Sequence, residues 1–365
     1  MHDRYMQEAL TLARKGLGRT SPNPAVGAVL MKDGEIVGRG FHVWSSKDHA
    51  EIVALREAGE LARGATLYVT LEPCNHTGRT SPCVDALIAA GVIRVVTAMK
   101  DPNPLVAGKG LVRLQEAGIE TVVDQHHTGE AEQINEPFLH SMRTGKPLVT
   151  LKSALTLDGK IAAPEDNSGW ITSEKAREHV QQLRHLTDCI LTGIGTVVAD
   201  DCLLTDRSGL ERSRPLMRIV ADSQLRIPLS SKMVASANGD LIIACTSAAA
   251  SDRRKALEKA GVEVLVLDGD DGRTNLQELV VQLGQRQYRS LMVEAGSKVN
   301  WAFLEQSIAD KIFFYYAPKI LGGMQSLPVA GGVGRRRRAD AIRMDRLQLH
   351  TITAQEFAVE AWVRK

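Results

Sequence analysis

The sequence has few aromatic residues, few cysteines and no excess of either charge. Aromatic residues make up 4% of the 365 residues, and the five cysteines are too few and too scattered for a disulfide framework. The 45 lysines and arginines nearly balance the 43 aspartates and glutamates, so the net charge of +2 gives no indication of a nucleic-acid or membrane-surface partner. No apolar run reaches the roughly 18 residues of a membrane-spanning helix, and the charged N-terminus lacks the apolar core of a secretory signal. We therefore expect a cytoplasmic protein that binds neither nucleic acid nor membrane.

The length predicts two globular domains, because 365 residues exceed one ordinary domain. In the first half, strand patterns at 25–31, 35–41, 66–71, 92–99 and 119–123 alternate with helical patterns at 5–17, 49–62, 82–90 and 110–117. The pair Asp33-Gly34 between the first two strands is a strong hairpin signal. This alternation with short connections predicts a three-layer α/β sandwich.

A second series of elements begins near Pro147. Strands are predicted at 148–155, 189–193, 217–222, 240–245, 262–267, 290–294, 311–317 and 357–363, with helices at 173–186, 248–260, 275–285 and 299–306. The polar stretch 142–147 separates the two series, so we expect domains at 1–146 and 147–365.

One group of residues in the first half has the chemistry of a metal site. His49 stands at the start of a helical pattern, Pro73-Cys74 follows a strand, and Cys83 opens the next helix. One imidazole and two thiolates are three zinc ligands, which leave the fourth tetrahedral position open for water, as in catalytic zinc sites. Glu51 is a candidate proton shuttle, although residues two apart in a regular helix point about 200° apart. His49 and Glu51 can therefore converge only where the helix begins.

The pattern His-x-Glu with Pro-Cys and a second cysteine is that of zinc nucleobase deaminases, in which the carboxylate is an acid/base. Three alternatives remain open at this point. The two cysteines could be small buried residues, the chain could be a deaminase of tRNA adenosine or of free cytosine nucleotides, or it could be a non-catalytic protein whose zinc only stabilises the fold. The usual motif is Cys-x-x-Cys, whereas eight residues separate Cys74 from Cys83.

Longer motifs resemble one family, the bifunctional deaminase-reductases of riboflavin biosynthesis, in which this wider cysteine spacing is normal. In the first half they are PNPAVG at 22–27, HAE at 49–51, TLEPCNHTGRTSPC at 70–83 and DPNP at 101–104. In the second half they are LKSALTLDGK at 151–160, WIT at 170–172, GTVVADD at 195–201 and VEAG at 293–296. The resemblance covers essentially the whole chain.

For the first half, the resemblance implies a cytidine-deaminase-like fold and zinc-dependent hydrolytic deamination of 2,5-diamino-6-ribosylamino-4(3H)-pyrimidinone 5′-phosphate. It implies that His49, Cys74 and Cys83 hold one zinc ion and that Glu51 transfers protons. The residues expected to hold the substrate are Asn23, His42, Arg79 and Asn103.

For the second half, the resemblance implies a dihydrofolate-reductase-like α/β domain in which NADPH reduces the ribosyl group of 5-amino-6-(5-phosphoribosylamino)uracil to ribityl. Gly296 and Ser297 lie between a predicted strand and a predicted helix, where free backbone N–H groups at the helix N-terminus can bind a dinucleotide phosphate. The expected NADPH contacts are Ser153, Trp170, Thr196, Asp200, Ser223, Gly296, Ser297, Lys298, Val299, Asn300, Trp301 and Ala302. The expected substrate contacts are Lys152, Ser168, Arg184, Leu204, Arg207 and Glu294, the two arginines being suited to the phosphate. The family also suggests a homo-oligomer acting on small phosphorylated pyrimidines.

Two features depart from the family pattern or are not explained by it. Cys202 stands where the family has proline, which is expected to loosen the turn that carries Leu204 and Arg207. The four arginines at 335–338 follow a glycine-rich stretch and could bind an anion or form a solvated loop.

Overall fold

A computed structural model describes residues 3–76, 81–102, 107–165 and 167–365. The chain divides into two compact units, Met1–Gly145 with Glu211–Arg214, and Lys146–Leu210 with Pro215–Lys365. None of the helices in the described ranges has the length and apolar character needed to cross a bilayer.

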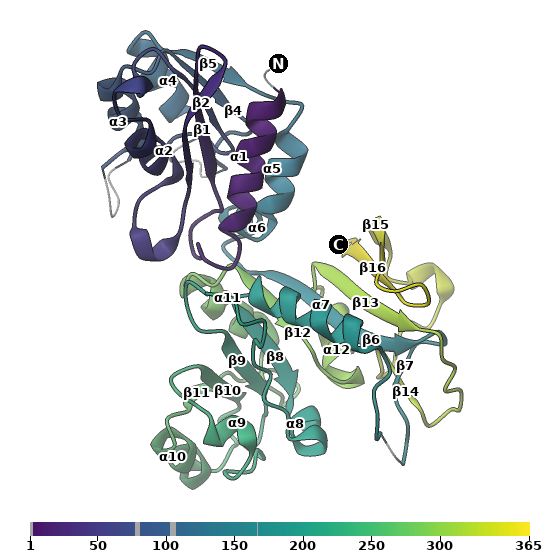
Figure 1. The fold of residues 1–365 in the computed structure, drawn as a ribbon. Helices are drawn as coiled ribbons and strands as arrows, with labels where there is room; N and C mark the ends of the chain where they lie inside the picture. The colour runs from purple at the N-terminus through teal and green to yellow at the C-terminus, as the bar shows by residue number, and fades with distance from the viewer. Residues whose placement is uncertain (1–2, 77–80, 103–106, 166) are drawn as a thin grey trace. The chain divides into compact units, whose positions relative to one another are not determined.

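The first unit is built on a mixed sheet with strand order β2-β1-β3-β4-β5 (Figure 1). The strands are β1 (Gly27–Lys32), β2 (Glu35–Phe41), β3 (Thr66–Val69), β4 (Arg94–Thr97) and β5 (Glu120–Val123). β1 is antiparallel to both β2 and β3, whereas β3, β4 and β5 are parallel. The predicted hairpin is confirmed: Asp33 and Gly34 both have positive φ, as the tight turn between β1 and β2 requires.

Helices cover both faces of this sheet, which confirms the predicted three-layer sandwich. They are α1 (Asp3–Lys15), α2 (Ala50–Ala58), α3 (Cys83–Ala90), α4 (Lys109–Glu116), α5 (Thr128–Ile134) and α6 (Glu136–Thr144). Figure 1 shows α1 and α5 on one face and α2, α3 and α4 on the other. Gly27 explains the close packing of α1 on β1, because a Cβ there would lie 1.9 Å from the carbonyl oxygen of Ala9.

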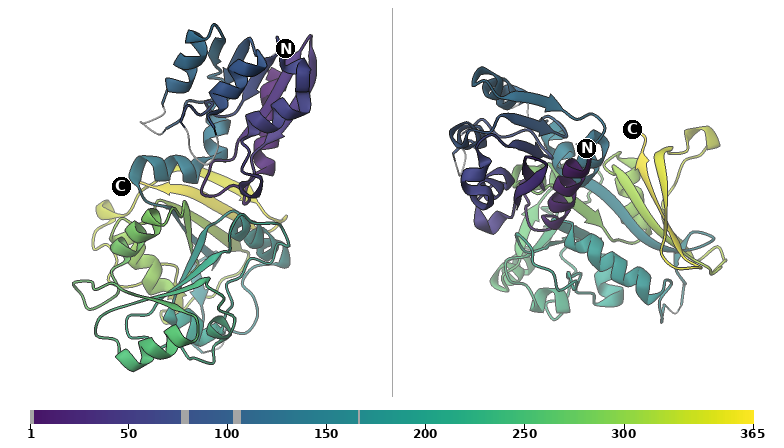
Figure 2. Two further views of the ribbon diagram at one scale, coloured as in Figure 1. Left: turned by 90° about the vertical axis from the view of Figure 1, so that its left-hand side faces the viewer. Right: turned by 45° about the horizontal axis from the view of Figure 1, so that its top comes forward.

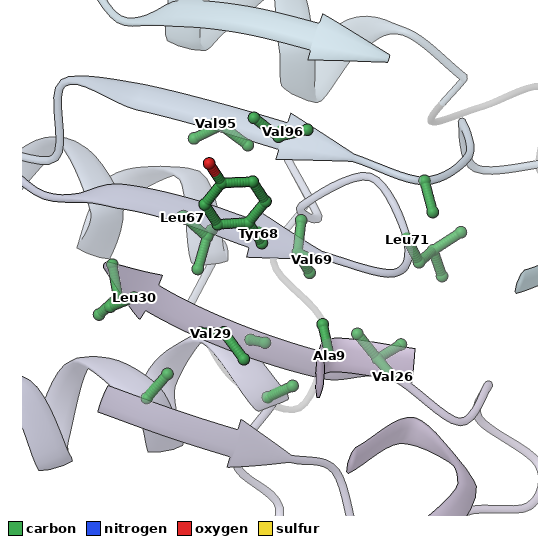
Figure 3. Packing of buried hydrophobic residues seen from close by; sticks show 14 of the residues in the cluster. Ala9, Val26, Val29, Leu30, Leu67, Tyr68, Val69, Leu71, Val95 and Val96 are labelled. Atoms are coloured by element: carbon green, nitrogen blue, oxygen red, sulfur yellow. The ribbon is translucent and has the colours of Figure 1, made fainter. Parts of the chain in front are cut away.

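The core of the first unit lies between the sheet and these helices. Figure 3 shows its centre, where Leu30 of β1 lies opposite Leu67 of β3, and Val29 lies opposite Tyr68. All four of these side chains are fully buried. This continuous apolar core holds the ends of β3 and the starts of α2 and α3 in place, where the candidate metal ligands are found.

The second unit contains a larger sheet, with strand order β11-β10-β9-β8-β12-β6-β13-β16-β15. Its strands are β6 (Leu148–Thr156), β8 (Cys189–Gly193), β9 (Met217–Ala221), β10 (Leu241–Cys245), β11 (Glu263–Val266), β12 (Ser290–Val293), β13 (Lys311–Ala317), β15 (Met344–Thr351) and β16 (Phe357–Val363). The strands from β11 to β13 are parallel, and β16 then pairs antiparallel with β13. In Figure 2 the yellow strands β15 and β16 extend the sheet beyond β13.

Both faces of the parallel part are buried, as expected for a sheet with helices on each side. Neighbouring residues of one strand belong to different apolar clusters: Leu191 packs in one and Ile190 in the other, and the same holds for Ile242 and Ile243. The helices are α7 (Glu174–His185), α8 (Ile194–Asp200), α9 (Lys232–Ala235), α10 (Ser251–Lys259), α11 (Leu276–Gln285) and α12 (Ser297–Glu305). Ser173 caps α7 by accepting a hydrogen bond from the Ala176 amide, as a helix start at this serine predicts.

Several elements were not predicted from the sequence. They are the short helices α5, α6, α8 and α9, the edge strand β15, and the small pair β7 (Lys160–Ala162) and β14 (Leu327–Pro328). No residue of β15 is buried, and the strand is held by its pairing with β16. Its sequence therefore lacks the apolar alternation by which a half-buried strand is recognised.

Candidate functional site

The three predicted zinc ligands lie together in the first unit. His49 immediately precedes α2, Cys83 is the first residue of α3, and Cys74 lies five residues beyond the end of β3. The Nδ1 atom of His49 is 3.2 Å from the Sγ atom of Cys83 and 3.5 Å from that of Cys74. One ligand atom from each of the three residues lies within 4.8 Å of the other two.

These distances fit a tetrahedral zinc ion. Zn–S distances of ~2.3 Å and Zn–N distances of ~2.0 Å separate sulfur and nitrogen ligands by roughly 3.6 Å at a tetrahedral angle. The Cys83 amide also donates a hydrogen bond to Cys74 Sγ at 3.3 Å, a contact that favours the thiolate needed for metal binding. Among residues 3–76, 81–102, 107–165 and 167–365, no fourth His, Cys, Asp or Glu belongs to this group. The donor set therefore suits a zinc ion with one position open.

Glu51 approaches the same point because α2 begins at Ala50. His49 has extended backbone angles, φ −77° and ψ 162°, and so lies outside the helix. The rotation of about 200° between residues two apart in a regular helix therefore does not separate its side chain from that of Glu51. The Glu51 carboxyl is buried, and it is hydrogen-bonded to Cys83. His49 and Glu51 therefore converge at the start of α2, as their sequence spacing requires.

The groups of this cluster perturb one another strongly. Burial raises the pKa of Glu51 to about 7. A hydrogen bond from Cys83 lowers the pKa of Cys74 to about 4, and the same bond raises the pKa of Cys83, since the second thiol is then the donor. A hydrogen bond with Cys74 raises the pKa of His49 to about 8. Such concentrated perturbation is typical of functional sites.

One predicted substrate contact, His42, lies beside the predicted zinc ligand His49, and a second, Asn23, contacts His42. His42 is buried, and its ring meets that of His49 edge-on, with 5.4 Å between the ring centroids. His42 Nδ1 is 2.7 Å from the carbonyl oxygen of Asp48, an acceptor, so Nδ1 carries the proton. In the neutral ring Nε2 then accepts from the Asn23 side-chain amide at 3.1 Å, which fixes the orientation of that amide. The other two predicted contacts, Arg79 and Asn103, lie outside the described residues.

A further carboxylate, which the sequence did not single out, supports the Cys74 segment. Glu72 is buried, and its Oε1 atom accepts from the amides of Gly110 at 2.9 Å and Leu111 at 3.4 Å. Its Oε2 atom accepts from Asp101 at 3.1 Å and Gly108 at 2.9 Å. Glu72 thus satisfies amides at the start of α4, where the residue at the cap position has no side chain. The sequence signal that could have identified Glu72 is its place as a charged residue at the end of an apolar strand, directly before Pro73-Cys74.

The same support includes a close backbone contact and an ion pair. A Cβ at Gly110 would lie 2.2 Å from the Pro73 carbonyl oxygen, so α4 can pack here only with glycine. Arg113 of α4 donates to Asn75 Oδ1 at 2.8 Å and pairs with Asp85 of α3 at 2.5 Å. One helix therefore contacts the segments that carry both cysteines.

Replacing Glu72 with glutamine should destabilise the first unit. An amide offers one acceptor oxygen, and its NH₂ group would face buried N–H donors, so we expect a loss of about 2–3 kcal/mol in the free energy of unfolding. Urea titration of the zinc-loaded chain measures this loss in the transition of the first unit. Glu57→Gln is the matched control, because Glu57 is exposed and accepts one backbone amide, that of Arg39. Equal midpoints for the two variants would contradict this role of Glu72.

In the second unit, one buried carboxylate gathers two cations. Glu294 follows β12 and pairs with Lys152 Nζ at 3.1 Å and with Arg184, whose Nε and Nη2 atoms donate at 2.7 and 3.0 Å. Burial raises the pKa of Glu294, but Lys152 and Arg184 outweigh it and lower that pKa to about 2. The third donor of Arg184, Nη1, is bonded to the Thr205 carbonyl at 3.0 Å. The Arg184 side chain is thus engaged by protein groups, whereas that of Arg207 is exposed.

The turn that lacks the family's proline is anchored on both sides of Leu204. The buried Arg218 donates to the Leu203 carbonyl at 3.3 Å, and Arg184 holds Thr205. Leu204 is buried and has a φ of +50°, an uncommon value for leucine, so the anchored neighbours hold a strained backbone.

The predicted NADPH contacts come from the carboxyl ends of adjacent parallel strands, the usual place for ligands in open α/β sheets. Ser223 follows β9, α8 with Thr196 and Asp200 follows β8, and Gly296 precedes α12 after β12. Val293 of β12 pairs with Leu151 of β6, so Ser153 of β6 lies at the same edge. The residues of α12 in this group are Ser297, Lys298, Val299, Asn300, Trp301 and Ala302.

The start of α12 has unsatisfied polar groups that suit a bound cofactor. Gly296 offers no side-chain cap, so the first amides of the helix are available to an anion. Within the described ranges, Ser297 Oγ and Asn300 Oδ1 are buried without a hydrogen-bond partner. Trp170 and Ser168 lie on an exposed segment, where Arg177 stacks on Trp170 at 4.9 Å. The arginines at 335–338 are exposed, and Arg335 lies over the Trp301 ring at 5.6 Å.

Comparison with known proteins identifies both units. Residues 1–99 match the cytidine and deoxycytidylate deaminase zinc-binding region, and residues 147–356 match the RibD C-terminal domain. The riboflavin biosynthesis protein RibD of Escherichia coli (strain K12) is 47% identical over 352 residues, which are 92% of this chain and 93% of that protein.

Solved structures agree over the full length. Acinetobacter baumannii RibD, form 1, has a TM-score of 0.89 at 37% identity and covers 99% of this chain and 98% of its own. The Thermotoga maritima diaminohydroxyphosphoribosylaminopyrimidine deaminase/5-amino-6-(5-phosphoribosylamino)uracil reductase has a TM-score of 0.81 at 34% identity, with coverage of 100% and 99%. The resemblance seen in the motifs is therefore confirmed, and the chain belongs to the RibD family of bifunctional riboflavin-biosynthesis enzymes, which combine a zinc-binding deaminase domain with an NADPH-dependent reductase domain.

Proposed function

We propose that residues 1–146 of this chain deaminate 2,5-diamino-6-ribosylamino-4(3H)-pyrimidinone 5′-phosphate. We propose further that residues 147–365 reduce the ribosyl group of the product, 5-amino-6-(5-phosphoribosylamino)uracil, to ribityl. The printed name of the Thermotoga maritima relative supports these substrates. The observation that carries the proposal is the convergence of His49, Cys74 and Cys83 beside the buried Glu51 carboxyl.

In the deaminase half, His49, Cys74 and Cys83 hold zinc, which when bound lowers the pKa of its water toward ~7. Glu51 takes a proton from the attacking water and returns one to the departing amine, because its carboxyl is buried beside the ligands and is not one of them. Asn23 holds the pyrimidine, and His42 keeps the Asn23 amide in one orientation through the hydrogen bond at 3.1 Å. Arg79 and Asn103 are the remaining substrate contacts that we propose.

In the reductase half, the amides at the start of α12 hold the dinucleotide phosphate, and the neighbouring strand ends orient the nicotinamide. Lys152, Glu294, Leu204 and Ser168 face the substrate. Arg207 binds the substrate phosphate, since it is exposed, while Arg184 orients Glu294 and the Thr205 backbone. We propose that the enzyme works in the cytoplasm as a homo-oligomer, with small phosphorylated pyrimidines as its substrates.

Stepwise product identification on the purified full-length chain tests this function. Ammonia should be released from the diaminopyrimidine without NADPH, and NADPH should be consumed only once the deaminated product is present. Release of ammonia from cytidine nucleotides or tRNA instead, or NADPH oxidation with the undeaminated substrate alone, would overturn the assignment.

A further inference from the structure

A second group of potential metal ligands lies in the first unit, apart from the deaminase ligands. His126 and His127 follow β5, and Asp3 is the first residue of α1. The Oδ1 atom of Asp3 is 3.1 Å from His127 Nε2 and 3.9 Å from His126 Nε2. One ligand atom from each of these residues lies within 4.8 Å of the other two. α1 and α5, which flank the group, lie side by side in Figure 1.

The His127 ring is held in the orientation of a metal ligand. Its side chain is 3% exposed, and its Nδ1 atom is 2.7 Å from Asp124 Oδ2, so Nδ1 carries the proton. In the neutral ring, the Nε2 lone pair is then directed at the group. Although His127 Nε2 lies only 3.1 Å from Asp3 Oδ1, it is a buried atom without a hydrogen bond of proper geometry. A carboxylate that orients an imidazole through its other nitrogen is the usual outer partner of a metal-bound histidine.

The backbone around His126 and His127 is also fixed. Asp124 Oδ1 accepts from the His126 amide at 3.1 Å, and the Asp124 amide donates to Thr97 of β4 at 2.8 Å. Thr128 donates to the Ala98 carbonyl at 2.7 Å. The two rings meet edge-on, with 4.9 Å between their centroids. Only Asp3 and His126 are exposed, so an ion can reach the group from solvent.

We propose that Asp3, His126 and His127 form a second metal site, for a divalent transition ion such as Zn²⁺. Two imidazoles and one carboxylate suit this class of ion and lack the many oxygen ligands that Ca²⁺ needs. The site contains no thiolate and shares no residue with the deaminase group. Its ion would connect the start of α1 to the junction of β5 and α5.

Equilibrium dialysis against Zn²⁺ tests this site on the full-length, untagged chain. His2, which lies outside the described residues, is replaced by alanine in every sample, because a histidine near the terminal amine could bind metal itself. We expect a tight and a weaker binding step. Asp3→Asn and His126→Ala should weaken the second step at least ~10-fold and leave the first unchanged. Both side chains are exposed, so the fold should tolerate these changes.

Two controls separate the sites. Asp33→Asn removes an exposed carboxylate from the β1–β2 turn and should change neither step. Cys83→Ser should abolish the tight step and keep the weaker one, so failure at one site is distinguishable from failure at the other. A chain that binds one zinc in total, or a second step of equal affinity in Asp3→Asn and His126→Ala, would overturn the proposal.

Discussion

Replacing Glu51 with glutamine should reduce ammonia release by ~10²–10⁴-fold while zinc stays bound and the reductase stays active. The physical reason is that glutamine keeps the shape of the side chain but cannot accept or deliver the proton. The three proposed zinc ligands, His49, Cys74 and Cys83, are unchanged in this variant, so the metal content should not change. The reductase residues belong to the other unit and should not be affected.

Three measurements on the same preparation check this result: ammonia release, zinc per chain, and NADPH oxidation with the deaminated product. Glu57→Gln, an exposed glutamate on the same helix α2, is the control and should retain full deamination. A Glu51→Gln variant with near-normal ammonia release would remove Glu51 from the mechanism. A variant without zinc would indicate that Glu51 supports the ligands instead.

Replacing Cys83 with serine should abolish zinc retention and deamination together. A hydroxyl is a far weaker zinc ligand than a thiolate, and the loss should exceed the ~10–100-fold cost of changing an outer partner. The substitution also removes the Cys83 sulfur that lies 3.2 Å from His49 Nδ1, while the Cys83 backbone amide can still donate to Cys74 Sγ. Zinc analysis after dialysis against a chelator measures the loss.

Cys245→Ala is the matched control, because Cys245 is equally buried but lies in β10 of the second unit. It should keep both zinc and deamination. For Cys83→Ser, NADPH oxidation with the deaminated substrate should continue at close to the normal rate. Loss of both activities in Cys83→Ser would argue against two independent sites.

Much of the fold was predictable, because buried strands and helix ends have clear local signals. The parallel strands β8, β9 and β10 are short apolar runs in the sequence. Gly91 directly follows the predicted helical stretch 82–90, and it ends α3 in the left-handed conformation that glycine favours. β15 and the short helices were missed because tertiary pairing, more than local pattern, stabilises them.

The candidate deaminase site was predictable in its residues but not in its support. His49, Glu51, Cys74 and Cys83 belong to motifs of recognisable chemistry, and the helix start at Ala50 was the one geometric condition. Glu72 was missed because its partners are backbone amides some 30 to 40 residues away, which no sequence pattern displays. Arg184 was expected to bind phosphate. Its contacts with Glu294 and Thr205 could not be predicted, because these residues are distant from Arg184 in the sequence.

The most direct test of the account is X-ray absorption at the zinc edge of the chain loaded with one equivalent of metal. We predict two sulfur ligands at ~2.3 Å and two nitrogen or oxygen ligands at ~2.0 Å, from the two cysteines, the histidine and a water. A first shell with no sulfur, or with four protein ligands and no water, would contradict the proposed deaminase centre.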